Sequence, residues 1–289
     1  MPPEDLAEDL DTGAQRGARA LADRFPDLGP GTVLIQAGTG FDATGLLDEP
    51  GAPVRMAEVL GASESPSPAG HPLVFRFGRC EGRTVLLASG RRHMYEGRGM
   101  APCVLPVCAA VQAGVRDIVL VSAAGAVQSE LKPGTVLAVT DHLNNLGASP
   151  LTGNQSMLPL PFPDMSAVYS QRLIGAFVNA AGDVGVEPRL GVYQANPGPQ
   201  FETPAEVDMA RRNGADVVGM SLVPEAIMAH ALGAEVMGLA VVANQAAHYG
   251  GRAVSHDDVL EAVDFASRYL VRSLRAFLRA LPPACSSVD

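Results

Sequence analysis

The stretch APCVLPVCAAVQAGVRDIVLVSAAG, residues 101–125, carries the pattern on which the fold depends. Its first part, Pro102–Ala113, is predicted to be a helix that stops at Gly114, because glycine commonly follows the last helical turn. The run Asp117–Val121 is apolar on both faces, which is typical of a strand buried in a parallel sheet. This strand ends at Ser122, where small residues begin. The stretch therefore predicts a helix, a turn and a buried strand in immediate succession.

The same alternation recurs along the chain. Further strands are predicted over Thr32–Gln36, Thr84–Ala88, Thr135–Thr140, Arg189–Gln194, Asp216–Val218 and Glu235–Val242. Further helices are predicted over 12–25, Ser166–Gly182, Pro204–Asn213 and Glu225–Leu232, with a last helix that Ser255 and Asp258 open as a capping box. Such alternation predicts one α/β domain over 1–289, with a mixed, mainly parallel sheet or distorted barrel flanked by helices. Residues 1–11 and 282–289 are expected to be flexible tails, and 61–72 and 144–165 to be loops.

Composition narrows the class of protein. The formal net charge of the 289 residues is −10 and the basic residues are dispersed, so nucleic acid is not an expected partner. The acidic start is unlike a signal peptide, and no uninterrupted apolar stretch approaches the roughly 20 residues that span a membrane. The cysteines lack zinc-site spacing, which predicts reduced thiols, no metal and a cytoplasmic location. They are Cys80, Cys103, Cys108 and Cys285.

Small, polar or cationic residues follow the ends of the predicted strands. Ligands of open α/β sheets bind beyond the carboxyl ends of the strands, so these residues are candidates for a site that takes a small, polar, anionic ligand. Taken singly, each has an ordinary structural explanation; Gly38-Thr39-Gly40, for example, lacks the third glycine of a dinucleotide fingerprint. The segments are Ala37–Gly40, Gly90–Gly97, Ser122–Gly125, Asp141-His142, Asn196–Thr203, Gly219–Ser221 and Asn244.

Together, the segments 90–97, 123–125, 198–203 and 219–225 and Asn244 resemble the trimeric class of purine nucleoside phosphorylases, and they occur in that family's order. HMYEG at 93–97 and GPQFET at 198–203 are the most specific segments, and the resemblance covers nearly the whole chain. It implies that the protein is a pentosyltransferase that splits purine nucleosides with inorganic phosphate into a free base and a pentose 1-phosphate. It also implies a homotrimer that needs no metal or organic cofactor.

For phosphate binding, the resemblance implies Arg91, His93, Ser221, His71 and the backbone N–H of Ala123. The planar donor fork of an arginine, a hydroxyl and an amide suit this anion. The family adds a Ser hydroxyl from a loop after the first strand. Here Thr39 keeps a hydroxyl if the loop spacing differs by one residue, whereas Gly38 takes the place without a hydroxyl if the alignment has no gap.

For the base, the resemblance implies that Glu202 accepts hydrogen bonds from purine N1–H and that Asn244 bridges O6 and N7. An amide donates and accepts at once, which suits the 6-oxopurines hypoxanthine and guanine, whereas Asp at this place would favour a 6-aminopurine. Asn244, Glu202 and His93 are the expected catalytic residues. Further base contacts are expected from Phe201 and Val218, and ribose contacts from Tyr95, Met220 and His256. Leu158 or Phe162 would cover the neighbouring subunit's site, while Asp141 and His142 look structural.

Three alternatives stay open from the sequence. A methylthioadenosine or methylthioinosine phosphorylase shares the scaffold, but Asn244 and His256 count against it, since a 5′-thioether needs no histidine partner. A non-catalytic nucleoside-binding homologue has only the altered 38–40 loop in its favour. The third alternative is an enzyme for a specialised nucleoside.

Overall fold

The computed structural model describes residues 9–38, 41, 43–61, 72–247 and 256–281. The strands are β1 (Val33–Ala37), β2 (Val54–Arg55), β3 (Val74–Cys80), β4 (Arg83–Ser89), β5 (Asp117–Ala126), β6 (Val136–Asn144), β7 (Arg189–Ala195), β8 (Val217–Gly219) and β9 (Glu235–Gln245). The α-helices are α1 (Leu10–Arg24), α2 (Met56–Leu60), α3 (Ala101–Gln112), α4 (Gln171–Asp183), α5 (Pro204–Arg212), α6 (Val223–Ala231) and α7 (His256–Ala280). Short 3₁₀ turns occur at Thr44–Leu46, Met94–Glu96 and Gln155–Met157.

The strands form one sheet in the order β2-β3-β4-β1-β5-β8-β7-β6-β9, and β9 returns to pair with β5. This last pairing closes β5, β8, β7, β6 and β9 into a five-stranded barrel, while β1 to β4 extend the sheet from β5. Pairing is parallel for β1–β4, β1–β5, β5–β9, β6–β7 and β7–β8, and antiparallel for β2–β3, β3–β4, β5–β8 and β6–β9. The predicted α/β fold with a mixed sheet and a distorted barrel is confirmed.

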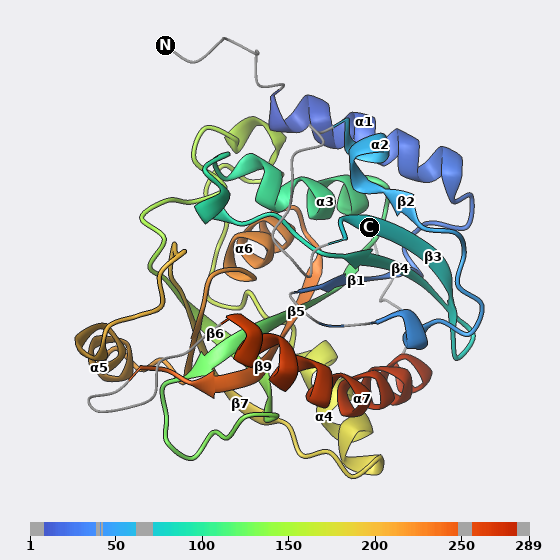
Figure 1. The fold of residues 1–289 in the computed structure, drawn as a ribbon. Helices are drawn as coiled ribbons and strands as arrows, with labels where there is room; N and C mark the ends of the chain where they lie inside the picture. Colours follow the sequence, from blue (N-terminus) through green and yellow to red (C-terminus); the bar gives the residue numbers. More distant parts are fainter. Residues whose placement is uncertain (1–8, 39–40, 42, 62–71, 248–255, 282–289) are drawn as a thin grey trace.

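Helices cover the sheet on two sides (Figure 1). On one side, α1 contacts α3 and α3 contacts α6, with α2 beside α1. On the other side, α4 contacts α7, and α7 packs on β9. Because both faces are covered, the central strands are mostly apolar: Leu34 of β1 lies in register between Leu86 and Ile118, and all three are fully buried. Each such side chain contributes about 1.5–3 kcal/mol through burial.

Several boundaries differ from the expectation. The strands predicted to end at Val121, Thr140 and Val242 continue to Ala126, Asn144 and Gln245, so Ser122–Gly125, Asp141-His142 and Asn244 lie within β5, β6 and β9 and not after them. Helix α1 begins at Leu10, whose side chain is buried, so the predicted tail 1–11 is wrong at its last two residues; 1–8 and 282–289 lie outside the described residues. Helix α4 begins at Gln171 and not at Ser166, because Ser170 caps it by accepting a hydrogen bond from the N–H of Leu173. The expected cap at Ser255 also lies outside the described residues.

Strand β3, and with it the β3–β4 hairpin, was not predicted, although Thr84–Ala88 of β4 was. The seven residues of β3 pair antiparallel with β4 from Val74↔Ser89 to Cys80↔Arg83. Its two-residue turn places Glu81 at φ 52° and Gly82 at φ 78°, which is the left-handed geometry that an X-Gly hairpin turn requires. The sequence signal was therefore Glu81-Gly82 between two β-prone runs. Of the predicted loop 61–72, residues 62–71 lie outside the described part.

Candidate active site

A buried arginine lies just beyond the end of β4, beside the end of β1 and the middle of β5. Arg91 follows β4, is 1% exposed, and places Nε 3.0 Å from Oε1 of Glu225. Its Nη1 donates to the backbone oxygen of Val121 at 2.8 Å and to Oγ of Ser221 at 3.2 Å. The guanidinium is thus held beside a serine hydroxyl by contacts from three separate segments, which is the arrangement expected of an anion cradle.

Gly38 lies against this arginine. A Cβ built on Gly38 would lie 2.9 Å from Nη1 of Arg91 and 2.7 Å from the oxygen of Val121. The backbone after β1 therefore approaches the guanidinium at a distance that only glycine permits. Thr39, the other candidate for the missing serine, lies outside the described residues, so its hydroxyl stays a prediction.

Glu225 joins the arginine to the turn that carries Ser221. Its Oε2 accepts a hydrogen bond of 2.9 Å from the N–H of Leu222, while Oε1 faces Arg91. Leu222 has φ 65° and ψ −51°, and the N–H of Val223 donates to the oxygen of Ser221 at 2.7 Å. This is a γ-turn of the strained kind, which persists only where the surroundings enforce it. One carboxylate therefore fixes both the guanidinium and the serine.

Hydroxyl groups continue inward from Ser221. Its Oγ is 2.8 Å from Oγ of Ser122, which is 3.3 Å from the phenolic oxygen of Tyr193. Burial raises the pKa of the Tyr193 hydroxyl, so this group stays protonated and can donate. Ser122 immediately precedes Ala123, whose backbone N–H was predicted to bind phosphate.

The HMYEG segment forms the next wall. The rings of His93 and Tyr95 stack with centroids 4.7 Å apart and an interplanar angle of 15°. Oε1 of Glu96 accepts from the backbone N–H of His93 at 2.8 Å, and Oε2 accepts from Nη1 of Arg92 at 2.7 Å. Burial acts to raise the pKa of the Glu96 carboxyl, but its contacts with His93 and Arg92 outweigh burial and lower the pKa to about 2. Glu96 is thus an ionised anchor for the segment.

Tyr95 and Met220 lie together against Gly198. A Cβ on Gly198, whose φ is 63°, would lie 3.2 Å from Cδ1 of Tyr95 and would collide with Sδ of Met220. Gly198 opens the GPQFET segment, and Met220 follows β8. The two residues expected to contact ribose are therefore adjacent. Burial, with a smaller effect of Glu96, raises the pKa of Tyr95 to about 12.

Glu202 lines a small cavity at the end of β7. The cavity has a volume of about 170 Å³, and its walls include Asn145, Gln194, Asn196 and Phe201. Nδ2 of Asn196 donates to Oε1 of Glu202 at 2.6 Å. Phe201, the expected base contact, is 41% exposed at the same wall. The cavity thus offers an aromatic surface beside a carboxylate.

Cross-strand pairing places Asn244 and Val218 at the end of the barrel where this cavity lies. A β-bulge between Ala124 and Gly125 brings Asn244 of β9 opposite Gly125 of β5. Gly125 in turn pairs with Val218 of β8, and Val218 pairs with Gln194 of β7. Neighbouring strands lie about 4.8 Å apart, so Asn244 lies within a few strand spacings of the Glu202 cavity. Its Nδ2 donates to the oxygen of Gln245 at 2.8 Å.

Most of the predicted site residues are thus brought to two adjoining places. Arg91 and Ser221 meet at the cradle beside the segment that carries His93 and Tyr95, and the base-site candidates gather around the barrel end. His71 and the side chain of His256 lie outside the described residues. Four polar contributors were given no role from the sequence: Glu225, Ser122, Tyr193 and Asn196. Ser122 and Asn196 each stand first in a candidate segment, and Tyr193 lies in a predicted strand. Glu225 stood within the quoted 219–225 segment, and its signal was a carboxylate in an otherwise apolar helix start.

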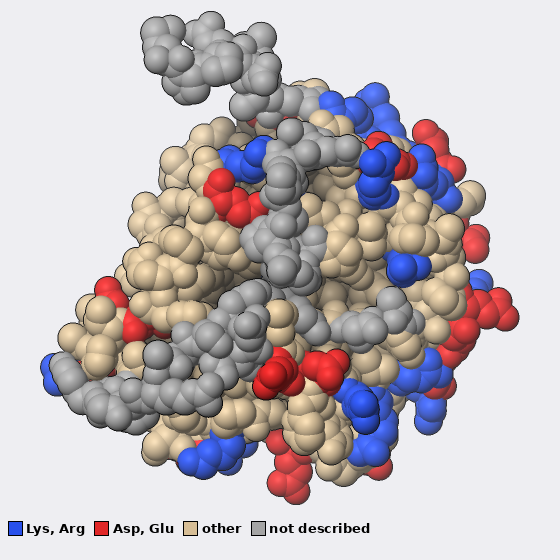
Figure 2. Space-filling view, in the orientation of Figure 1, with Lys and Arg blue, Asp and Glu red and all other residues tan. Residues whose placement is uncertain are grey.

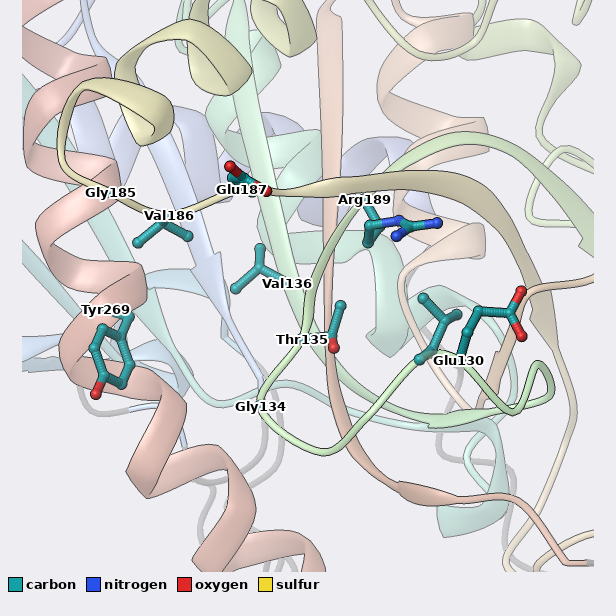
Figure 3. Close-up of a pocket in the computed structure, with 10 residues that line it drawn as sticks. Glu130, Gly134, Thr135, Val136, Gly185, Val186, Glu187, Arg189 and Tyr269 are labelled. Atoms are coloured by element: carbon teal, nitrogen blue, oxygen red, sulfur yellow. The ribbon is translucent and has the colours of Figure 1, made fainter.

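A second cavity, of about 380 Å³, lies elsewhere, at the amino ends of β6 and β7 (Figure 3). Its walls come from the Glu130–Val136 segment, from Gly185–Arg189 and from Tyr269 of α7, and include none of the predicted site residues. Within the described residues, no cluster of three or more His, Cys, Asp or Glu side chains could hold a metal, and no helix is long and apolar enough to cross a membrane. On the face in Figure 2, basic and acidic side chains are intermixed.

Comparison with known proteins identifies the family of the chain and agrees with its fold. The family model described as the phosphorylase superfamily matches residues 32–279, and the chain belongs to that superfamily. It is 36% identical to purine nucleoside phosphorylase 1 of Geobacillus stearothermophilus, over 93% of this chain and 97% of that protein. It is 38% identical to the purine nucleoside phosphorylase of Mycobacterium tuberculosis, over 89% of this chain and 92% of that protein.

A solved structure agrees with these relatives. The crystal structure of Schistosoma mansoni purine nucleoside phosphorylase in complex with inosine superposes with a TM-score of 0.84 at 26% identity, over 94% of this chain and 98% of that one. Within the superfamily the chain is thus an enzyme of the purine nucleoside phosphorylase group, a pentosyltransferase.

Proposed function

We propose that this enzyme catalyses the reversible phosphorolysis of 6-oxopurine nucleosides and deoxynucleosides such as inosine and guanosine, with inorganic phosphate as co-substrate and no cofactor. The observation that carries the proposal is the buried Arg91 held beside the Ser221 hydroxyl, next to a barrel end with Glu202 and Asn244. An anion cradle beside a carboxylate and an amide fits a reaction between phosphate and a base with both donors and acceptors.

In the proposed reaction, a phosphate oxygen attacks C1′ while the C1′–N9 bond breaks and its electron pair passes to the purine. The transition state resembles the oxocarbenium ion of glycoside hydrolysis, so holding the anion against C1′ and stabilising the leaving base provide the catalysis. Arg91, Ser221, His93 and the backbone N–H of Ala123 would bind phosphate. Thr39 and His71 are expected to complete this set.

Base recognition follows from hydrogen-bond chemistry. An ionised Glu202 only accepts, so it pairs with the N1–H of hypoxanthine or guanine and opposes the bare N1 of adenine. Asn244 would donate to the purine as negative charge develops at O6 and N7. Phe201 and Val218 would contact the base, and Tyr95, Met220 and His256 the ribose.

We also propose a homotrimer in which Phe162 covers the neighbouring subunit's site. Between the two candidates, Leu158 is 9% exposed and packs with residues of α1, α3 and α6, whereas Phe162 is 92% exposed. A large aromatic side chain with that exposure suits burial against a second copy. The buried, free thiols of Cys80, Cys103 and Cys108 suit a reducing cytoplasm.

A panel of nucleosides tests the proposed substrate class. Inosine, guanosine, adenosine and 5′-methylthioadenosine are each incubated with and without phosphate, and free base is measured. The expected result is release of hypoxanthine and guanine only with phosphate. Binding of a nucleoside would not by itself identify the substrate, since the Schistosoma mansoni enzyme has been crystallised with inosine and with adenosine. Preference for the methylthio substrate would overturn the proposed class, and no turnover would favour a binding-only or specialised protein.

The variant Asn244→Asp sharpens this test. An ionised aspartate at 244 can accept a hydrogen bond from a 6-amino group but cannot donate one to a 6-oxo group. We expect its preference to move from inosine towards adenosine. An unchanged ratio of the two activities would remove Asn244 from base recognition.

A further inference from the structure

Two amide side chains and one carboxylate converge on Asn196, which lies just after the end of β7. Oδ1 of Asn196 accepts one hydrogen bond from Nε2 of Gln194 and one from Nδ2 of Asn145, both of 2.9 Å. Nδ2 of Asn196 donates to Oε1 of Glu202 at 2.6 Å. Gln194 is 3% exposed and Asn196 8% exposed, whereas Asn145 is exposed and Glu202 half-buried, so the centre of the cluster is buried and its rim reaches the surface.

The direction of this network follows from its donors. The oxygen and nitrogen of an asparagine amide are assigned from the hydrogen bonds they make. Two neighbours present NH₂ groups to one end of Asn196, so that end is the carbonyl oxygen and the NH₂ group must face Glu202. The network therefore sets an N–H donor, and not a carbonyl oxygen, against Oε1 of Glu202.

The contact also distinguishes the two carboxylate oxygens of Glu202. Oε1 of Glu202 is engaged by Asn196, while Oε2 has no hydrogen-bond partner among the described residues. Glu202 and Asn196 line the same cavity of about 170 Å³, in which Glu206 is the other charged group. A side chain anchored through one oxygen presents the other in a defined direction.

We propose that Asn196 is a positioning and specificity-determining residue, which orients Glu202 so that one oxygen meets the N–H edge of the base and rejects bases that carry an acceptor there. This inference rests on the proposed function, because it assumes that Glu202 meets the N1 edge of a purine. It adds that discrimination between 6-oxo and 6-amino purines depends on a residue that need not touch the base. Gln194 and Asn145 act through Asn196 by fixing its orientation.

The variant Asn196→Asp isolates the proposed contact. Aspartate keeps the shape of asparagine and still accepts from Gln194 and Asn145, but its remaining oxygen repels Glu202 where an N–H was donated. Hydrogen bonds to charged groups are strong enough that we expect kcat/KM for inosine to fall about 10- to 100-fold. The ratio of inosine to adenosine activity should fall as well, while the KM for phosphate and the melting temperature change little.

The pH profile provides a readout that a merely structural role would not change. In Asn196→Asp, the carboxylates at 196 and 202 would share a proton as the pH is lowered, since two such groups in contact cannot both ionise easily. The loss of kcat/KM for inosine should therefore become smaller at acidic pH. Glu206, the other carboxylate of the cavity, is present in both the parent and the variant, so its titration does not account for the difference. Asn144→Asp is the matched control: Asn144 also accepts through Oδ1, from the N–H of Leu146, and donates through Nδ2, to the oxygen of Ala148.

The deciding experiment combines turnover with direct binding. Phosphorolysis of inosine and adenosine and the affinity for hypoxanthine by calorimetry are measured for the parent enzyme, Asn196→Asp and Asn144→Asp. Weaker hypoxanthine binding and lost selectivity in Asn196→Asp alone would support the inference. Equal affinity and selectivity in all three proteins would overturn it, as would a raised phosphate KM with a lowered melting temperature. A parent enzyme that binds hypoxanthine without turnover would refute the proposed function, and the calorimetric comparison would still decide the role of Asn196.

Discussion

Arg91 and Glu225 form a buried ion pair, with Nε of the arginine 3.0 Å from Oε1 of the glutamate and only 1% and 3% of their side chains exposed. Charges removed from water in this way are tolerated because each compensates the other. The same glutamate accepts a hydrogen bond from the N–H of Leu222. The orientation of the Arg91 guanidinium and the position of the Ser221 hydroxyl therefore depend on one carboxylate.

Glu225→Gln should weaken phosphate binding selectively. Glutamine keeps the size of the side chain but not its charge, so Arg91 loses its counter-ion and Ser221 loses part of its support. We expect the KM for phosphate to rise about 10- to 100-fold, the effect of losing a hydrogen bond between charged groups, while the KM for inosine changes little.

The surface glutamate Glu58, which pairs with the exposed Arg55, provides the control. Glu58→Gln should change the free energy of unfolding by less than about 1 kcal/mol, as is usual for exposed pairs, and should leave both KM values unchanged. Initial-rate kinetics with each substrate varied in turn would check both variants. A Glu225→Gln enzyme with parental phosphate KM would show that the ion pair does not shape the cradle.

Gly198→Ala should disturb nucleoside binding, whereas Gly147→Ala should not. Both glycines have a left-handed backbone, with φ 63° and 68°, so alanine is strained at each and costs about 1–2 kcal/mol. Only at Gly198 would the new Cβ meet Met220 and Tyr95, since nothing lies within 4 Å at Gly147.

We therefore expect both glycine variants to lose unfolding free energy, Gly198→Ala the more because Met220 must shift, and a raised KM for inosine only in Gly198→Ala. Chemical denaturation and steady-state kinetics on the pair separate the two effects. Equal kinetics in both variants would mean that Met220 and Tyr95 do not line the nucleoside site.

Glu96 should contribute to stability in acid. Its pKa is about 2 in the folded protein and 4.5 as the ordinary value, so the folded state binds the proton less tightly than the unfolded chain. The contribution is complete above the ordinary pKa and is lost as the pH falls through the folded one. Between pH 4.5 and 2, the parent enzyme should therefore lose more stability than Glu96→Gln does. Urea unfolding at a series of acidic pH values measures the difference, and parallel curves would contradict the assignment.

Phe162→Ala tests the proposed role of the neighbouring subunit. The side chain is 92% exposed in the single chain, so its removal should cost this chain little stability. If Phe162 covers a site on a second copy, the KM for inosine should rise while the mass measured by sedimentation stays that of a trimer. Unchanged kinetics would exclude Phe162 from the site, and a monomeric parent protein would exclude the arrangement altogether.

Much of the fold could be predicted because its core strands are buried on both faces. Runs such as Asp117–Val121 have no polar face, and the glycines after the helices mark the turns between them. The β3–β4 hairpin was missed because β3 lies outside the centre of the sheet and carries Arg76 and Arg79 among its apolar residues. Closure of the barrel by β5 and β9 depends on tertiary contacts that no local pattern encodes.

The site was predictable where a residue type carries its own chemistry. Arg91, Ser221 and Glu202 stand in specific segments and were proposed from them. Glu225 and Asn196 were missed because their importance lies in their partners, 134 and 6 residues away along the chain, and such pairings appear only on folding.

The most direct test of the account is the product balance of inosine cleavage. Hypoxanthine and ribose 1-phosphate are quantified together after incubation with phosphate, and again with phosphate omitted. The account predicts equal amounts of the two products with phosphate and no hypoxanthine without it. Hypoxanthine released together with free ribose, or at the same rate without phosphate, would contradict phosphorolysis at the Arg91 cradle.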